Sequence, residues 1–108
     1  MSANIVTRAI INYLGHGGYK VWRNNNMGVY DRKTAKYRKN PSQLHGVPDI
    51  IGFHRKTGIF IAVEVKIGKD KLSYAQEMFL KEVVDSRGIA IVAHSFDDFF
   101  DKFKNIRL

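Results

Sequence analysis

Asp49, Glu64 and Lys66 are the residues whose types and spacing are best suited to carry out chemistry. The glutamate and the lysine belong to an apolar run, residues 59–67, that is typical of a β-strand. The two-residue period of a strand separates two faces, one with Ile59, Ile61, Val63, Val65 and Ile67 and the other with Phe60, Ala62, Glu64 and Lys66. Phe60 and Ala62 indicate that the second face is partly covered, where two charges are costly unless they are paired or bound to a metal. The alternative is that this end of the strand emerges into water and both charges are solvated.

Asp49 favours the first of these interpretations. It follows Pro48 and begins a neighbouring apolar strand, so its carboxylate is expected at a sheet end beside Glu64. Two carboxylates that close repel each other unless a cation lies between them, and Mg²⁺ suits a site of one or two carboxylates completed by water and phosphate. Lys66 points the same way as Glu64. It could orient or help deprotonate an attacking water, or stabilise charge on a phosphodiester under attack.

The elements that must position these residues follow from periodicity and capping signals. The sequence predicts helices over residues 2–14 and from Ser73 to about Asp85, and a closing helix that begins at Ser95. It predicts strands over residues 19–23, 49–53, 59–67 and 89–93. The apolar face of the second helix is expected to consist of Ala75, Met78, Phe79 and Val83. The resulting order is α-β-β-β-α-β-α, and no linker or repeat divides it, so residues 1–108 are expected to form a single α/β domain.

Composition and charge narrow the class of protein. Hydrophobic residues make up 44% of the chain, cysteine is absent, and no apolar stretch approaches the length of a membrane span. A cytoplasmic protein without membrane association is therefore expected. Residues 1–48 hold eight basic residues and one acidic residue, whereas residues 49–108 hold ten basic and nine acidic residues. A basic field on one part of a chain attracts a polyanion, and nucleic acid is the usual one.

The polar segment from Asn24 to Gly46 carries much of this charge. Residues 29–31 and 36–38 could pair as a hairpin around residues 32–35, or the whole segment could be a mobile loop. We expect nucleic acid to contact the polar side chains of Arg23, Asn24, Arg32, Lys33, Lys36, Arg38 and Lys39, with Tyr30 and Tyr37 stacking on bases or packing against sugars. The alternative is a solvated loop whose tyrosines anchor it to the core.

Pro48-Asp49, a gap of fourteen residues and then Glu64-Val65-Lys66 resemble the signature of PD-(D/E)xK nucleases. More narrowly, four segments resemble the VRR-NUC (virus-type replication-repair nuclease) domain. They are Val21-Trp22-Arg23-Asn24-Asn25, Gly46-Val47-Pro48-Asp49-Ile50-Ile51-Gly52, Val63-Glu64-Val65-Lys66, and Ser73 to Gln76. The PD…ExK pattern alone is weak, but the four segments in the correct order are fairly specific. The resemblance implies a restriction-endonuclease-like core.

The resemblance also implies a role for each matching residue. Asp49 and Glu64 would bind Mg²⁺ or Mn²⁺ together with the main-chain carbonyl of Val65, and Lys66 would be the catalytic lysine. Gln76 would support the centre from the following helix, although a capping box with Ser73 explains a glutamine there equally well. Many relatives carry an acid in the first helix. Here no Asp or Glu precedes Asp31, so that ligand is absent.

The expected function is therefore metal-dependent cleavage of DNA. A standalone domain of this size resembles phage-encoded members of the family, which would act in a bacterial host cell. We expect a homodimer that cuts branched DNA, with a four-way (Holliday) junction as the favoured substrate, because two symmetric cuts need two active centres. The apolar surface for pairing is expected on the closing helix, which carries Phe96, Phe99, Phe100 and Phe103. The alternative is a non-catalytic nucleic-acid-binding module that retains the nuclease fold.

Overall fold

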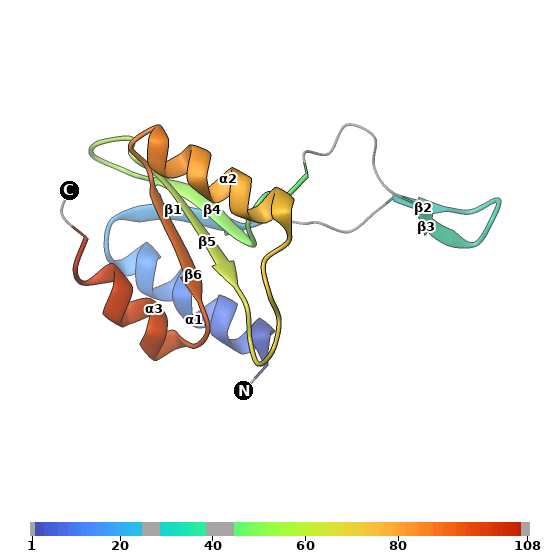
Figure 1. The fold of residues 1–108 in the computed structure, drawn as a ribbon, viewed down its shortest axis with the longest axis horizontal. Coiled ribbons are helices and arrows are strands. Elements are labelled where there is room, and N and C mark those ends of the chain that lie inside the picture. Colours follow the sequence, from blue (N-terminus) through green and yellow to red (C-terminus); the bar gives the residue numbers. More distant parts are fainter. Residues whose placement is uncertain (1, 25–28, 39–44, 107–108) are drawn as a thin grey trace.

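The computed structural model describes residues 2–24, 29–38 and 45–106, and it contains three helices and six strands in these ranges (Figure 1). In chain order they are α1 (Ala3–His16), β1 (Tyr19–Arg23), β2 (Val29–Asp31), β3 (Lys36–Arg38), β4 (Ile50–His54), β5 (Phe60–Val65), α2 (Tyr74–Asp85), β6 (Ile89–Ala93) and α3 (Phe96–Phe103). Apart from the β2–β3 pair, the order is the expected α-β-β-β-α-β-α. None of the helices in the described ranges has both the length and the apolar character that a membrane span requires.

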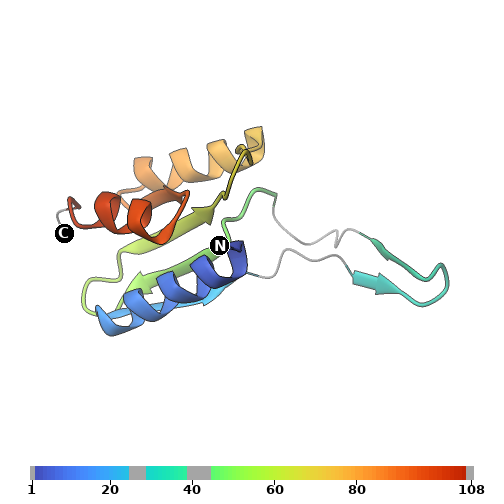
Figure 2. The same cartoon turned by 90° about the horizontal axis from the view of Figure 1, so that it is seen from below.

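A mixed four-stranded sheet in the order β1-β4-β5-β6 forms the centre of the molecule. Strand β4 pairs antiparallel with both β1 and β5, whereas β5 and β6 run parallel and are joined by the crossover through α2. Figure 2 shows α1 and α2 on opposite sides of this sheet. Helix α3 shares the α1 side, because Phe99 packs with Val6, Ile10 and Leu14 in one cluster of buried residues.

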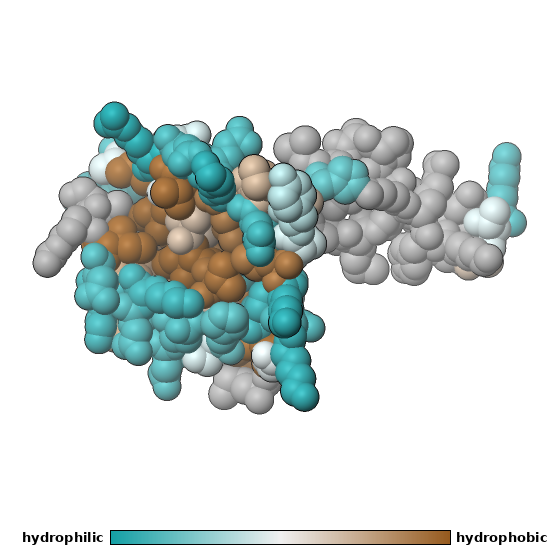
Figure 3. Space-filling model, viewed as in Figure 1, coloured by the Kyte–Doolittle hydropathy of each residue, from teal (hydrophilic) through white to brown (hydrophobic). Residues whose placement is uncertain are grey.

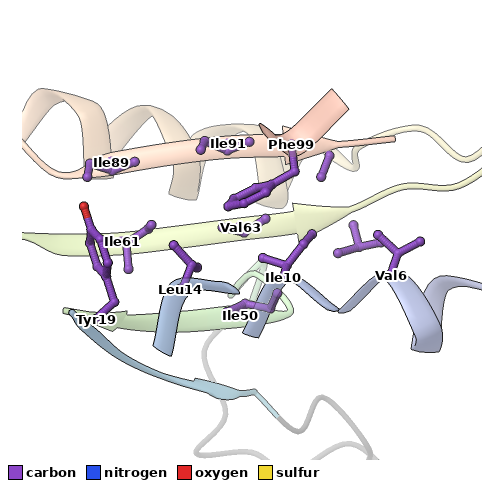
Figure 4. Packing of buried hydrophobic residues seen from close by; sticks show 12 residues of the cluster. Val6, Ile10, Leu14, Tyr19, Ile50, Ile61, Val63, Ile89, Ile91 and Phe99 are labelled. Carbon is purple, nitrogen blue, oxygen red and sulfur yellow. The ribbon is translucent and has the colours of Figure 1, made fainter. Parts of the chain in front are cut away.

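The larger part of the core lies between the sheet and these two helices (Figure 4). Val6, Ile10 and Leu14 recur every fourth residue along α1 and are almost fully buried. They meet Ile61 and Val63, which lie on the apolar face predicted for the long strand. The other face of the sheet is covered more narrowly by α2, through Leu80 and Val83 against Ala62.

Several boundaries differ from those predicted. Helix α1 continues to His16, two residues past its expected end, because Gly17 rather than Gly15 takes the C-cap position. Strand β5 ends at Val65, so Lys66 lies just beyond the regular strand. On α2 the buried side chains are Leu80 and Val83, whereas Met78 is 43% exposed. The prediction that Met78 belongs to the buried face was therefore wrong.

The predicted hairpin between residues 29–31 and 36–38 is confirmed. Strands β2 and β3 pair antiparallel, with Tyr30 opposite Tyr37, and the turn between them contains Arg32 and Lys33. The pair forms a two-stranded sheet of its own. It extends away from the four-stranded sheet in both views (Figures 1 and 2).

The phenylalanines of α3 are used inside the chain rather than on its surface. Tyr13 of α1 makes edge-to-face contacts with Phe96, Phe99, Phe100 and Phe103, at centroid distances between 5.7 and 6.0 Å. Of these four rings only Phe100 is substantially exposed, at 38%. The apolar surface of α3 that was expected to be available for dimer pairing is therefore largely buried against α1.

Strand β6 is an edge of the sheet, and apolar side chains gather over it between the polar surfaces of α2 and α3 (Figure 3). The Ala93 carbonyl accepts the N–H of Lys66 on the β5 side, so the carbonyl of Val92 points to the free edge. Lys102 Nζ donates to that Val92 oxygen at 2.7 Å. A lysine bound to the edge in this way discourages pairing with another strand.

Candidate active site

The register of β4 and β5 brings Asp49 and Glu64 together. Ile50 pairs with Val63, so the next position outward on each strand places Asp49 opposite Glu64, on the face that α2 covers. Asp49 is held on both sides: its Oδ2 accepts the Val65 N–H at 2.9 Å, and its carbonyl accepts the Asn24 N–H at 2.7 Å. The Val65 N–H thus fixes the carboxylate and the Asn24 N–H fixes the main chain that carries it.

The loop that leads into Asp49 is fixed by a glycine. Gly46 has a φ of +77°, and a Cβ at this position would lie 2.3 Å from the carbonyl oxygen of Ala75 in the first turn of α2. Only a residue without a side chain permits this approach. The start of α2 is therefore held against the segment that leads through the buried Pro48 to Asp49.

Glu64 is the most unusual residue of the core. Its side chain is 1% exposed, and its Oε2 is buried without a hydrogen-bond partner. Burial raises the pKa of Glu64 to about 9; the hydrogen bond to Asp49 and the repulsion from it act in the same direction, while the charge of Lys66 lowers it. The prediction that this strand end is not simply solvated is therefore confirmed for Glu64.

Lys66 follows β5 directly and is half buried. Its N–H donates to the carbonyl of Ala93 at 2.9 Å, and its own carbonyl lies 2.9 Å from Nδ1 of His94. The positive charge of Lys66 acts on Glu64, because it lowers the pKa of that carboxyl group and so opposes the effect of burial. Asp49, Glu64 and Lys66, the acid, acid and lysine that the sequence suggested, are thus brought to the end of the sheet where β4 begins and β5 ends.

The two carboxylates fit a hard divalent cation. Within the described ranges no group of three or more His, Cys, Asp or Glu side chains is gathered to hold a metal, so any ion here would rely on the Asp49–Glu64 pair, main-chain oxygens and water. The unpartnered Oε2 of Glu64 and its raised pKa show that the protein alone does not stabilise the charged form of this carboxyl group. A cation between the two side chains would replace the proton that Glu64 otherwise holds.

The side chain of Gln76 forms the capping box with Ser73 that the sequence suggested as the alternative to a role in the catalytic centre. Its Oε1 accepts the N–H of Ser73 at 2.8 Å, and the Ser73 hydroxyl accepts the N–H of Gln76 at 3.2 Å, which completes a capping box. The contact of Gln76 with a catalytic centre stays a prediction.

The residues predicted to contact nucleic acid fall into two groups. Arg23 ends β1, and its guanidinium donates to the Asn4 side chain of α1, on the side of the sheet opposite α2. Asn24 donates its main-chain N–H to the carbonyl of Asp49 and therefore lies beside that residue. Arg32 and Lys33 are exposed at the tip of the β2–β3 hairpin. Lys36, Tyr37 and Arg38 form β3, and Lys39 lies outside the described residues.

His94 is a neighbour of the site that the sequence did not single out. It follows β6 immediately, as Lys66 follows β5, and its ring reaches the carbonyl of Lys66. The order of elements could have predicted this contact, because the carboxyl ends of two adjacent parallel strands lie at the same end of a sheet.

Comparison with known protein families gives one result. The model of the VRR-NUC domain matches residues 23–97, which include Asp49, Glu64, Lys66 and Gln76 as well as His94. A comparison with curated proteins found no match.

Proposed function

The chain belongs to the VRR-NUC family, a family of PD-(D/E)xK nucleases, and on this basis we propose that it is a Mg²⁺- or Mn²⁺-dependent DNA endonuclease. Nucleases of this type generally use a divalent metal. The observation that carries the proposal is the buried Glu64 beside Asp49, with one oxygen unpartnered and a pKa of about 9. Evolution rarely retains an uncompensated buried acid where only packing is required.

Asp49 and Glu64 would hold the ion, with the carbonyl of Val65 as a third ligand, and the bound ion would supply an activated water and neutralise charge at the scissile phosphate. Lys66 orients the attacking water and stabilises the negative charge that develops on the phosphate. Its position one residue beyond β5 and its electrostatic influence on Glu64 support this role. Gln76 supports the centre from the first turn of α2.

The test is cleavage of labelled linear and branched DNAs in the presence of Mg²⁺ or Mn²⁺. Asp49→Asn, Glu64→Gln and Lys66→Met should each lower the cleavage rate at least about a hundredfold while DNA binding persists. Lys69→Met is the matched control, because Lys69 is an exposed lysine three residues away. Ca²⁺ should support binding without efficient turnover. A wild-type protein that binds DNA but cleaves no member of the panel would instead be the non-catalytic binding module.

The exposed basic residues of the hairpin tip support DNA as the substrate. Replacing Arg32 and Lys33 with glutamate should weaken binding to DNA of any sequence and flatten its salt dependence. The same double change at Arg55 and Lys56 is the control. These residues are exposed in the β4–β5 turn, at the opposite end of those strands from Asp49 and Glu64. Equal losses from both double variants would contradict a specific role for the hairpin.

We further propose that the enzyme is a homodimer that favours four-way junctions. The exposed apolar residues that suit pairing are Phe53, Phe60 and Met78, at 38%, 38% and 43% exposure. Phe53 and Phe60 are paired on neighbouring strands, and Phe60 and Met78 line one groove of about 740 Å³. Strand geometry separates Phe60 from Glu64 by roughly 13 Å. A second subunit packed around Phe60 therefore lies away from the carboxylate pair.

Light scattering and junction cleavage test the dimer together. Phe60→Ser should give monomers and abolish paired cuts in a four-way junction, leaving single nicks. Phe100→Ser is a matched control, because Phe100 has the same 38% exposure but lies on α3. Dissociation caused by Phe100→Ser instead would place the interface on α3. A wild-type monomer that prefers plain duplex would refute both parts of the proposal. The expected place of action is the cytoplasm, which for a phage-encoded member is that of the bacterial host.

A further inference from the structure

Lys66, the proposed catalytic lysine, lies at the point where the pairing of β5 with β6 ends. Strand β5 stops at Val65, and after the bond from the Lys66 N–H to Ala93 no further β5–β6 ladder hydrogen bond follows. A side chain attached at such a point depends on what holds its own peptide groups. Here the carbonyl of Lys66 has a side-chain partner, Nδ1 of His94 at 2.9 Å. Both main-chain groups of Lys66 are thus tied to the end of β6.

The direction of this bond follows from its chemistry. A carbonyl oxygen only accepts, so Nδ1 of His94 must carry the hydrogen. A neutral ring protonated at Nδ1 and a doubly protonated ring both satisfy this requirement, so the contact does not depend on the charge of His94. The ring is otherwise exposed, and its position is not explained by packing in the core.

His94 is itself held by the start of α3. Its N–H donates to Asp98 Oδ2 at 3.0 Å, and the N–H of Asp98 donates to the Ser95 hydroxyl at 3.0 Å. Lys102 Nζ contacts the same Asp98 oxygen at 3.0 Å. The pKa of Asp98 lies below its usual value, first because of the hydrogen bond from His94, so the carboxylate is charged and remains a strong acceptor. A chain of contacts therefore runs from α3 through His94 to Lys66.

We propose that His94 is a positioning residue whose ring Nδ1–H fixes the main chain of Lys66 and thereby the direction in which the lysine side chain reaches the carboxylate pair. This inference rests on the proposed nuclease function. His94 acts through Lys66 and not on the substrate, so its loss should lower kcat and leave KM and DNA affinity unchanged.

Three substitutions at position 94 separate this role from a merely structural one. In His94→Asn the amide nitrogen lies at the same number of bonds from Cβ as Nδ1 and can donate to the Lys66 carbonyl. In His94→Gln the amide is one bond further out, and in His94→Leu no donor is present. We expect kcat to fall roughly 10- to 100-fold in the leucine and glutamine variants and to stay within about threefold of wild type in the asparagine variant. Because the side chain is exposed, all three variants should unfold at nearly the wild-type temperature.

A measurement that needs no activity accompanies the kinetics. Nitrogen-15 NMR of the His94 ring at about pH 8, in protein without metal, should show the tautomer protonated at Nδ1. A ring protonated at Nε2 would overturn the inference. An active wild type would also overturn it if all three variants behaved alike, or if the loss appeared in KM or DNA affinity. A wild type that cleaves no DNA would remove the proposed function, and this inference with it, which distinguishes the two failures.

Discussion

Glu64→Gln should convert a pH-dependent stability into a nearly pH-independent one. Glu64 has a pKa of about 9 in the folded protein, first because it is buried, against an ordinary value of 4.5. The stability that protonated Glu64 contributes is fully present below about pH 4.5 and is lost as the pH rises toward the folded pKa. Between these values the folded state holds one proton more than the unfolded state. The free energy of unfolding then falls by up to about 1.4 kcal/mol per pH unit.

From about pH 5.5 to about pH 8.5 this slope gives a loss of up to about 4 kcal/mol in protein without metal. We therefore expect the pH-dependent loss in the free energy of unfolding over this range to be roughly 2 to 4 kcal/mol larger for wild type than for Glu64→Gln. Mg²⁺ should restore stability to the wild type increasingly as the pH rises, since the ion takes the place of the proton. It should leave Glu64→Gln unchanged.

The assay is urea unfolding in EDTA and in Mg²⁺ at several pH values, with Glu82→Gln as the control. Glu82 is an exposed acid on α2, so the same acid-to-amide change there should preserve the wild-type pH profile. Parallel profiles for wild type and Glu64→Gln would refute the reasoning that burial raises the pKa of Glu64. Equal stabilisation of both proteins by Mg²⁺ would refute its place in the metal site.

Three further predictions concern single positions. Gly46→Ala should lower the free energy of unfolding by at least about 2 kcal/mol, because its Cβ would overlap the Ala75 carbonyl at a positive φ. Tyr19→Phe should be neutral or raise the free energy of unfolding by about 1 kcal/mol, because the Tyr19 hydroxyl is buried without a partner and points toward the apolar β6 (Figure 4). DNA binding should change the fluorescence of Trp22, the only tryptophan of the chain. This side chain is 46% exposed, and Trp22 pairs with Ile51, which is two residues from Asp49.

Each of these predictions has a direct check. Gly58 also has a positive φ, +75°, but a Cβ there would meet nothing within 4 Å, so Gly58→Ala isolates the cost of the backbone conformation. Equal destabilisation of the two alanine variants would remove the proposed contact with α2. A marked loss of stability in Tyr19→Phe, measured by urea unfolding, would mean that the hydroxyl has a partner. Fluorescence that stays constant through a DNA titration would place the substrate away from β1.

The elements that the sequence predicted well are those whose signals are local. The Ser73–Gln76 capping box, the alternation along β5 and the apolar run of β6 each lie within a few residues, and the structure confirms all three. Glu64 was recognisable for the same reason, since a charge on a partly covered strand face breaks a local pattern.

The features that the sequence did not predict depend on contacts between distant segments. Tyr13 of α1 contacts the four phenylalanines of α3, and the periodicity within α3 does not predict that α1 is its packing partner. Whether Met78 or Leu80 is buried depends on how α2 is rotated against the sheet. The bond between His94 and Lys66 spans 28 residues and exists only because β5 and β6 run in parallel.

The separate β2–β3 sheet makes the molecule modular in a way that matters for engineering and for divergence. The hairpin extends away from the four-stranded sheet (Figures 1 and 2), whereas Glu64 lies on β5 and Asp49 lies directly before β4, two strands of that sheet. Insertions, deletions or exchanges between residues 29 and 38 therefore need not disturb the four-stranded sheet that carries Asp49 and Glu64. Under the proposed function, grafting a different hairpin at this position should change which DNA is bound while the cleavage chemistry is retained.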